Sequence, residues 1–509
     1  PDAGKTTLTE KLLYSAGAIH EAGEVRARGD RRRARSDWMA IEQQRGISVT
    51  SSVMTFRHEN ILFNLLDTPG HQDFSEDTYR TLTAVDSAIM VIDAAKGIEA
   101  QTRKLFEVCR LRNIPIITFI NKVDREGRSP FELLDQIAEV LQLDVSPQNW
   151  PIGLGGLFHG LYDFGANSLV TVDKKDGLSI GSLLPCTGLD DPLIDTLIPA
   201  QAADVLREEG GLASEAYPQF DRAKFDSGDL TPVYFGSALK LVGVRQLLMG
   251  LARYAPAPQP QPALPSPVDP REARVTGFVF KVQANMDPNH RDRIAFLRVC
   301  SGALKRGMKL ANPRLGKSIA IHNPITFFAA DRELAEVALP GDIVGIPNHG
   351  TLRVGDTLTE KGELAFTGLP DFAPEILRRV RLDDPLKVKQ MRRGLSDLAE
   401  EGVIRLFKPA IGSQWIIGVV GELQLDVLAT RMEQEYGVKL GFEESPWAVA
   451  RWLSSDDPLR LKRMIETNRA NMAEDQDGAP VLMMRNDWEF GRFVEECPGI
   501  EFLAIRERL

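Results

Sequence analysis

Apolar and polar positions follow two periodicities along the first half of the chain, one typical of strands and one typical of helices. Apolar runs of strand length end in polar or glycine-bearing turns at four places: Ile61–Leu66, Ser87–Asp93, Ile114–Ile120 and Thr231–Phe235. Between them, Gln101–Arg112 and Phe131–Leu143 have helical spacing. Strands that alternate with helices predict a parallel sheet with crossover helices. We therefore expect a doubly wound α/β domain over residues 1–254, interrupted by an insertion at about 150–229 where the periodicity weakens.

The second half of the chain has a different pattern. Residues 255–270 contain seven prolines, which predict a stiff extended linker. Glycine turns then separate β-rich segments, which predict a small β-barrel domain over 271–383: Val275–Val282, Ile294–Val299 and Ile343–Ile346. From residue 384 to 509 helical and strand-like segments alternate and predict an α+β domain: Val388–Glu401, Val403–Phe407, Trp415–Val420 and Glu422–Tyr436.

Composition narrows the class of protein. The 509 residues are 43% hydrophobic and 26% charged, as is usual for globular proteins, and no apolar run approaches a membrane span. The net charge of −10 gives no hint of nucleic-acid binding, so any RNA contact must use a local patch. The four cysteines lack metal-ligand spacing. We expect reduced thiols in a cytoplasmic protein with no membrane contact.

The chain opens with a phosphate-binding pattern. The residues Asp2, Ala3, Gly4, Lys5, Thr6 and Thr7 match the second half of G-x-x-x-x-G-K-[ST], and a helical pattern follows from Leu8. Backbone N–H groups at such a helix start converge on phosphates. Lys5 would bridge the β- and γ-phosphates, and the Thr6 hydroxyl would bind Mg²⁺. We expect the first motif position and the strand feeding the loop to lie before Pro1.

A second motif, Asp67-Thr-Pro-Gly-His71, follows a predicted strand. Ligands bind at the carboxyl edge of such a sheet, where Asp67 would support the Mg²⁺ shell. Gly70 can bring its N–H against the γ-phosphate because it has no side chain. His71 is placed to orient the attacking water; taken alone, it would more often be a solvated loop histidine.

Two further segments predict guanine recognition. Asn121-Lys122-Val-Asp124 follows a buried strand, and the Asp124 carboxylate would accept hydrogen bonds from the N1–H and exocyclic amine of guanine, which adenine lacks. The tripeptide Ser237-Ala238-Leu239 would present the Ala238 N–H to the guanine O6. Each segment alone has an ordinary alternative as a polar turn, but their order makes coincidence improbable. Together they predict a P-loop GTPase that binds GTP and GDP with Mg²⁺.

With these segments placed, Arg45-Gly-Ile-Ser48-Val-Thr50 and the Asp67–His71 motif resemble the translational GTPases of the elongation factor G class. In that class a switch hydroxyl binds Mg²⁺ in the GTP state. The resemblance implies that Ser48 has this role, although Thr50 is a near alternative.

Longer stretches resemble the bacterial peptide chain release factor 3 family. They are spread over the predicted domains: Ser36–Met39, Asp73–Leu82, Gln283–Pro288, His290–Arg293, Asn348–Gly350 and Gly421–Asp426. This resemblance implies a ribosome-stimulated GTPase of translation termination that promotes dissociation of codon-reading release factors. The chain would bind the ribosome as a monomer and affect those release factors indirectly.

Other functions remain open. The chain could be an elongation factor G-like translocase or another ribosome-binding GTPase, although translocases continue with further domains. It could also bind the ribosome in a nucleotide-dependent way without hydrolysis, or bind nothing tightly because its phosphate loop is incomplete.

Two arginine-rich stretches are candidates for RNA contact. The first precedes the first switch and contains Arg26, Arg28, Arg31, Arg32, Arg33 and Arg35. The second lies near the start of the α+β domain and contains Arg378, Arg379, Arg381, Lys387, Lys389, Arg392 and Arg393. The alternative for the first is a solvated arginine-rich loop, and the alternative for the second is the face of an amphipathic helix.

Overall fold

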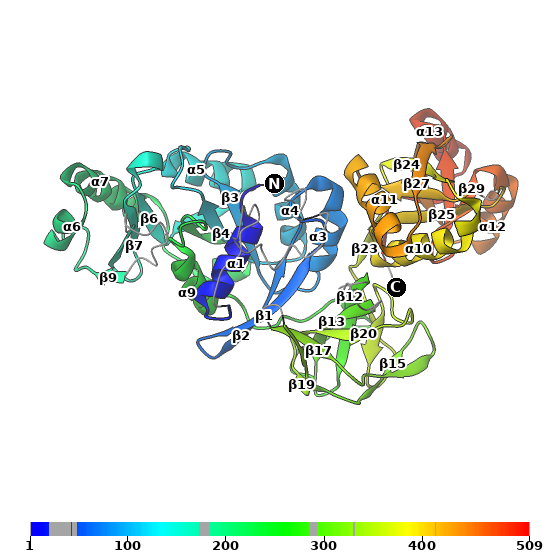
Figure 1. Cartoon of the computed structure of the whole chain (residues 1–509), viewed down its shortest axis with the longest axis horizontal. Helices are drawn as coiled ribbons and strands as arrows, with labels where there is room; N and C mark the ends of the chain where they lie inside the picture. Colours follow the sequence, from blue (N-terminus) through cyan, green and yellow to red (C-terminus); the bar gives the residue numbers. More distant parts are fainter. Residues whose placement is uncertain are drawn as a thin grey trace. The chain divides into compact units, whose positions relative to one another are not determined.

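The computed structural model describes residues 2–19, 42, 48–172, 183–284, 293–328, 331–412 and 414–507 (Figure 1). The chain forms two compact units. The first contains Pro1–Gly70, Val85–Gln259 and Phe327–Arg332, and the second contains His71–Ala84, Pro260–Thr326 and Glu333–Leu509. The chain passes from Gln259 to Pro260 within the predicted linker. Unlike the predicted domain 1–254, however, the first unit does not include residues 71–84.

A parallel sheet organises the first unit. Its order is β3 (Ala88–Asp93), β4 (Ile116–Asn121), β10 (Leu230–Phe235) and β5 (Asp144–Pro147), with every neighbouring pair parallel. All residues of β4 and β10 are buried, which explains their continuous apolar sequence. The predicted α/β fold is therefore confirmed, with strand ends within two residues of those expected.

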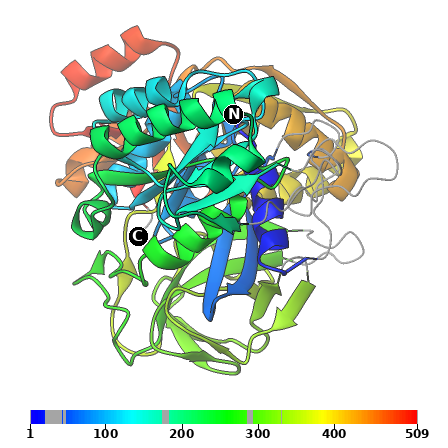
Figure 2. The same cartoon turned by 90° about the vertical axis from the view of Figure 1, so that its left-hand side faces the viewer.

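Helices cover this sheet. Helices α1 (Lys5–Ser15) and α9 (Val244–Tyr254) share a hydrophobic cluster with Ile117 and Phe119 of β4. Helix α4 (Ala100–Leu111) packs beside α5 (Pro130–Leu141). The hairpin of β1 (Ser52–His58) and β2 (Ile61–Asp67) adds Met54 and Phe56 to the α1 cluster. Figure 2 shows these two blue strands alongside the dark blue α1.

The insertion has its own secondary structure. Strands β6 (Asn149–Ile152), β7 (Gly160–Asp163), β8 (Ser168–Thr171) and β9 (Leu183–Pro185) form an antiparallel sheet. Helices α6 (Pro192–Leu197), α7 (Ala200–Ala216) and α8 (Arg222–Asp226) follow. The buried Asn149 joins β6 to the parallel sheet, because its Nδ2 donates to the Phe235 carbonyl at 3.1 Å and its Oδ1 accepts from the Phe235 N–H at 2.7 Å.

The second unit begins at His71, contains helix α3 (Ser75–Leu82) and continues with an antiparallel β-rich domain. Its main strands are paired in the order β16 (Lys317–Ala320), β15 (Lys309–Asn312), β21 (Thr357–Thr359), β12 (Thr276–Ala284), β13 (Arg293–Ser301) and β20 (Ile343–Pro347). Shorter strands accompany them: β11 (Ala263–Leu264), β14 (Leu304–Lys305), β19 (Val337–Ala338), β22 (Ala365–Phe366) and β23 (Pro370–Phe372). Strands β17 (Ile325–Phe328) and β18 (Asp331–Leu334) each have residues in both units. Buried aliphatic residues fill its core.

The C-terminal region consists of two β-α-β-β-α-β halves. The first contains β24 (Ile376–Leu382), α10 (Val388–Glu401), β25 (Arg405–Pro409), β26 (Ile416–Val419), α11 (Glu422–Tyr436) and β27 (Leu440–Glu444). The second contains β28 (Val449–Ser454), α12 (Pro458–Thr467), β29 (Met472–Glu474), β30 (Pro480–Met484), α13 (Asp487–Glu496) and β31 (Glu501–Leu503), before β32 (Ile505–Glu507). Pairing of β25 with β29 joins the halves into one sheet.

This architecture confirms the expected α+β character but divides it more finely than the sequence pattern did. Strand β24 pairs with β26 and β27, so it belongs with the C-terminal region. The predicted boundary at 383/384 therefore lies after the first strand of that region. Most residues of β24, its first two arginines included, are half-buried; Leu377 is buried and Arg381 is exposed.

We predict that Asn149→Ala destabilises the first unit by roughly 2–4 kcal/mol, because it leaves the buried N–H and C=O of Phe235 without their side-chain partners. Calorimetric unfolding of the variant should show a lower midpoint for the transition of this unit. Glu107→Ala, an exposed change on α4, is the control and should shift stability by less than about 0.5 kcal/mol. Equal midpoints for the two variants would contradict the role of Asn149.

Candidate nucleotide-binding site

The start of α1 has the geometry of an anion-binding turn. Gly4 is its N-cap and adopts the left-handed conformation, with φ of 94°. A Cβ at Gly4 would lie 2.5 Å from Nδ2 of Asn121, so no larger residue fits without displacing that side chain. Lys5 and Thr6 form the first turn, where free N–H groups and the helix dipole favour a phosphate. The half-buried Thr7 lies in the same turn.

Asn121 connects three of the predicted motifs. Its Nδ2 donates to the Ala3 carbonyl at 2.8 Å, while its Oδ1 accepts from the Ala238 N–H at 2.9 Å. Its neighbour Lys122 reaches the Asp2 carbonyl with Nζ. The structure thus brings the α1 turn, the segment after β4 and the segment after β10 together, as the sequence predicted. The N–H of Ala238 is engaged with Asn121, so a guanine O6 would have to share it.

A carboxylate that the motif analysis did not single out completes this arrangement. Asp93, the last residue of β3, lies 2.7 Å from Nζ of Lys122. Burial is the largest single influence on the pKa of Asp93 and raises it, but the hydrogen bonds from Lys122 and the Ala95 N–H, together with the charge of Lys122, outweigh burial and lower the pKa below its ordinary value. Its position at the end of a predicted parallel strand was the signal that sequence reasoning could have used.

The predicted base-reading carboxylate has a basic neighbour. Asp124 is mostly buried, and its Oδ2 lies 3.7 Å from Nζ of Lys240. Ser237 is buried, and its hydroxyl accepts from the Lys240 N–H at 3.3 Å. Leu239 projects outward. A guanine edge that reaches Asp124 would therefore lie beside an ammonium group as well as a carboxylate.

The predicted metal ligands lie on separate elements, and two of them are in contact. Oγ1 of Thr6 is 3.0 Å from Oγ of Ser48. Asp67, at the end of β2, is buried and acts electrostatically on Lys5. Burial lowers the pKa of Lys5, and the negative charge of Asp67 opposes this effect. Two hydroxyls and a carboxylate form the all-oxygen donor set that Mg²⁺ prefers.

Thr50 takes a different role from Ser48. Its N–H and that of Val49 both donate to the carboxylate of Glu42, at 3.2 and 2.9 Å. This fully buried glutamate fixes the backbone beside Ser48 and was not identified from the sequence. The geometry favours Ser48 over Thr50 as the hydroxyl that shares a site with Thr6.

The remaining predicted residues flank the boundary between the units. Gly70 is half-buried and closes the first stretch of the first unit. His71 opens the second unit, where its side chain is 41% exposed and its Nδ1 accepts from the Asp73 N–H at 3.2 Å.

The structure describes only the second of the two arginine-rich stretches. The first, at residues 26–35, lies outside the described residues. In the second, most cations have acidic partners: Arg378 with Glu422, Arg379 with Glu443, Arg381 with Asp383 and Arg393 with Asp397. Lys387 donates to the Gly437 carbonyl at 2.6 Å. This pairing favours a charged protein surface over an RNA-binding patch.

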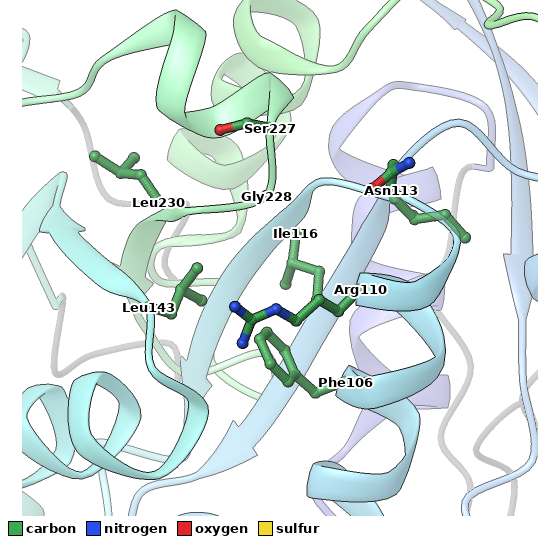
Figure 3. A pocket seen from close by; sticks show the side chains of 9 residues that line it. Phe106, Arg110, Asn113, Ile116, Leu143, Ser227, Gly228 and Leu230 are labelled. Atoms are coloured by element: carbon green, nitrogen blue, oxygen red, sulfur yellow. The ribbon is translucent and has the colours of Figure 1, made fainter.

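A separate pocket lies at the opposite edge of the sheet (Figure 3). Its lining includes Phe106 and Arg110 of α4, together with Ile116 and Leu230 from the beginnings of β4 and β10. The predicted nucleotide residues follow the ends of the same strands. Ligands of parallel α/β sheets bind at the carboxyl ends, so this pocket is not the nucleotide site.

Among the described residues, no helix has the length and apolar character needed to cross a membrane. The same residues hold no group of three or more His, Cys, Asp or Glu placed to bind a metal ion.

Comparison with known protein families assigns most of the chain. Residues 1–257 match the elongation factor Tu GTP binding domain, residues 274–361 match elongation factor G domain 2, and residues 366–494 match the class II release factor RF3 C-terminal domain.

Among solved structures, the chain is similar to the crystal structure of ttk003000868 from Thermus thermophilus. The TM-score is 0.70 at 23% identity, over 89% of this chain and 67% of that one. This likeness concerns the fold. The match over residues 1–257 covers half of the sequence and carries the GTP-binding motifs. The chain therefore belongs to the translational GTPases that share the elongation factor Tu GTP binding domain.

Proposed function

We propose that this GTPase acts in translation termination, where the ribosome stimulates its hydrolysis of GTP and it promotes the dissociation of codon-reading release factors. One observation carries the proposal: a GTP-binding domain is combined with a C-terminal region that matches the class II release factor RF3 C-terminal domain. We place the protein in the cytoplasm, as a monomer that binds the ribosome.

In this proposal the residues after β4 and β10 read the base. Asp124 accepts from the N1–H and exocyclic amine of guanine, while Asn121, Lys122, Ser237, Ala238 and Leu239 form the surrounding wall. Rejection of adenine follows because a mostly buried carboxylate would be left without hydrogen-bond donors.

The α1 turn and the adjoining hydroxyls hold the phosphates and the metal. Asp2, Ala3, Gly4 and Thr7 supply backbone groups, and Lys5 bridges the β- and γ-phosphates. Thr6, Ser48 and Asp67 would hold Mg²⁺, which neutralises phosphate charge when bound. Gly70 directs its N–H to the γ-phosphate, and His71 orients the attacking water.

A translocase is the second candidate, because residues 274–361 match elongation factor G domain 2. The two functions differ in what moves on the ribosome: a release factor in one, a tRNA in the other. A termination assay and a translocation assay run in parallel therefore separate them.

We predict that Asp124→Asn weakens GDP binding by about 100-fold or more and shifts preference toward xanthine nucleotides, because O2 of xanthine accepts a hydrogen bond where guanine donates one. Competition binding with GDP and xanthosine diphosphate measures this. Asp195→Asn, which alters a surface carboxylate paired with Arg207, is the control and should bind like the wild type. Full retention of guanine preference by the Asp124 variant would remove it from base reading.

We also predict that Ser48→Ala raises the Mg²⁺ concentration needed for half-maximal GTP binding by about tenfold, since a lost ligand costs on the order of 1.4 kcal/mol. Thr50→Ala is the matched comparison and should change it less than about twofold, because its described contact uses the backbone N–H. Magnesium titration with a fluorescent GTP analogue tests both variants. The reverse order of effects would transfer the metal-binding role to Thr50.

The termination role predicts a GTP-dependent effect on release factors. A labelled codon-reading release factor should dissociate from a termination complex faster when this protein is added with GTP than with GDP, because the GTP form favours one ribosomal arrangement. Stopped-flow fluorescence measures the dissociation rate. No acceleration, together with tRNA movement in a parallel assay, would replace this function with translocation.

A further inference from the structure

The segment His71–Ala84 directly follows Gly70 and belongs to the second unit. It contains His71 and helix α3 (Ser75–Leu82). An isolated helix of this length is not stable in water, so its position depends on contacts with its surroundings. These contacts come mainly from the C-terminal region, more than 300 residues later in the sequence.

The first contact is at the beginning of α11. The carboxylate of Asp73 accepts from the Leu423 N–H at 3.0 Å. Gly421, the N-cap of α11, lies so close that a Cβ there would be 2.0 Å from the Asp73 carboxyl carbon. The positive end of the helix dipole thus meets a carboxylate. The same Asp73 donates its backbone N–H to Nδ1 of His71.

The second contact is at the end of α10. The buried Arg80 donates to the carbonyls of Glu401 and Gly402, at 3.4 and 3.1 Å. A Cβ at Gly402 would lie 1.9 Å from Nη1 of Arg80, so the approach requires glycine. Here the negative end of a helix meets a cation. The charges of the segment therefore match the ends of two different helices.

A buried ionic network lies between these two contacts. Oε2 of Glu76 is 3.1 Å from Nη2 of Arg80 and 2.9 Å from Nη2 of Arg405, and Arg405 is 2.7 Å from Asp371. All four side chains are at least nine-tenths buried. Burial alone would lower the pKa of Arg405, but the carboxylates of Asp371 and Glu76 raise it above its ordinary value. Arg405 therefore remains charged and gives Glu76 one geometry.

The β-rich domain fixes the remainder of the segment. Nζ of the buried Lys281 lies 3.5 Å from the carboxylate of Asp77. Nη1 of the buried Arg298 donates to the Ala84 carbonyl at 2.5 Å, at the end of the segment. The segment is thus held along its length by residues of the second unit.

We propose that Arg405 is a positioning residue for the His71–Ala84 segment: through Glu76 it fixes α3, and thereby holds His71 in one place within the second unit. The inference rests on the proposed role of His71. Buried ion pairs contribute little net stability compared with apolar packing, but breaking one leaves an uncompensated buried charge. With His71 in its proposed role, a loosened network is expected to slow hydrolysis.

Arg405→Lys tests this role while it keeps the positive charge. Lysine loses the planar fork that joins Glu76 to Asp371, so the variant should fold but hold α3 loosely. We expect the single-turnover rate constant of ribosome-stimulated hydrolysis to fall about tenfold, with GDP affinity and half-saturating ribosome concentration within about twofold of the wild type. Arg314→Lys is the control: Arg314 is paired with the buried Asp356 and donates to the Thr351 carbonyl, both in the β-rich domain.

A double variant separates positioning from general damage. His71→Ala should lower the stimulated rate by about 100-fold, and adding Arg405→Lys should lower it no further, because both changes act through the same side chain. If the two losses multiply, or if Arg314→Lys slows hydrolysis as much as Arg405→Lys does, the proposal is overturned.

Amide hydrogen exchange measured without ribosomes tests the positioning role of Arg405 independently of the proposed termination function. Amides of residues 71–84 should exchange faster in Arg405→Lys than in the wild type, while those of α12 and α13 should not change. Equal exchange in residues 71–84 would refute the positioning role. If the wild type is not stimulated by ribosomes but this exchange pattern holds, only the proposed termination function fails.

Discussion

Two hydrogen bonds of one buried amide hold the candidate site together. Asn121 donates to the Ala3 carbonyl and accepts from the Ala238 N–H, and each bond ties a different loop to the end of β4. Because the amide is 2% exposed, losing either partner would leave a polar group buried without compensation. The absence of a side chain at Gly4 allows the close approach. The loops that would contact base and phosphate therefore keep one relative geometry.

The segment that carries His71 is held by a different kind of force. Amide hydrogen bonds of Asn121 hold the α1 turn, with one ammonium contact from Lys122, whereas Asp73, Glu76 and Arg80 are all held through their charged side chains. A buried charge that loses its partner is strongly unfavourable. The segment is therefore costly to displace from its partners in the second unit.

The sequence predicted those features of this protein that depend on residues close together in the chain. Asn121 and Asp124 could be placed because they lie at and just after the end of β4, an apolar strand of the parallel sheet. Asp67 could be placed at the end of an apolar strand, but that strand, β2, pairs antiparallel with β1 and lies outside the parallel sheet. The fold class followed from the alternation of strand-like and helical segments. The assigned chemical roles of these residues remain predictions, because contact with a nucleotide is not a property of the chain alone.

Other features depend on long-range contacts and left no local pattern. The pairing of Glu76 with Arg405 spans 329 positions, and the buried Glu42 lies in a polar stretch that resembles an exposed loop. The boundary near β24 was misplaced because its partners, β26 and β27, come later in the chain. The division of the C-terminal region into two halves was missed for the same reason, since helical and strand periodicity do not report which strands pair.

The distance in sequence between α3 and its partners also orders the events of biosynthesis. The contacts of Arg80 with Gly402, and of Glu76 with Arg405, join residues 322 and 329 positions apart. At roughly 5–20 residues per second, a ribosome needs on the order of 15–65 s to make that stretch. During this interval the nascent chain already has its phosphate-binding turn but lacks the residues that hold α3. In a newly made chain, residues 71–84 thus lack the charged partners that hold α3 until the C-terminal region has emerged and folded.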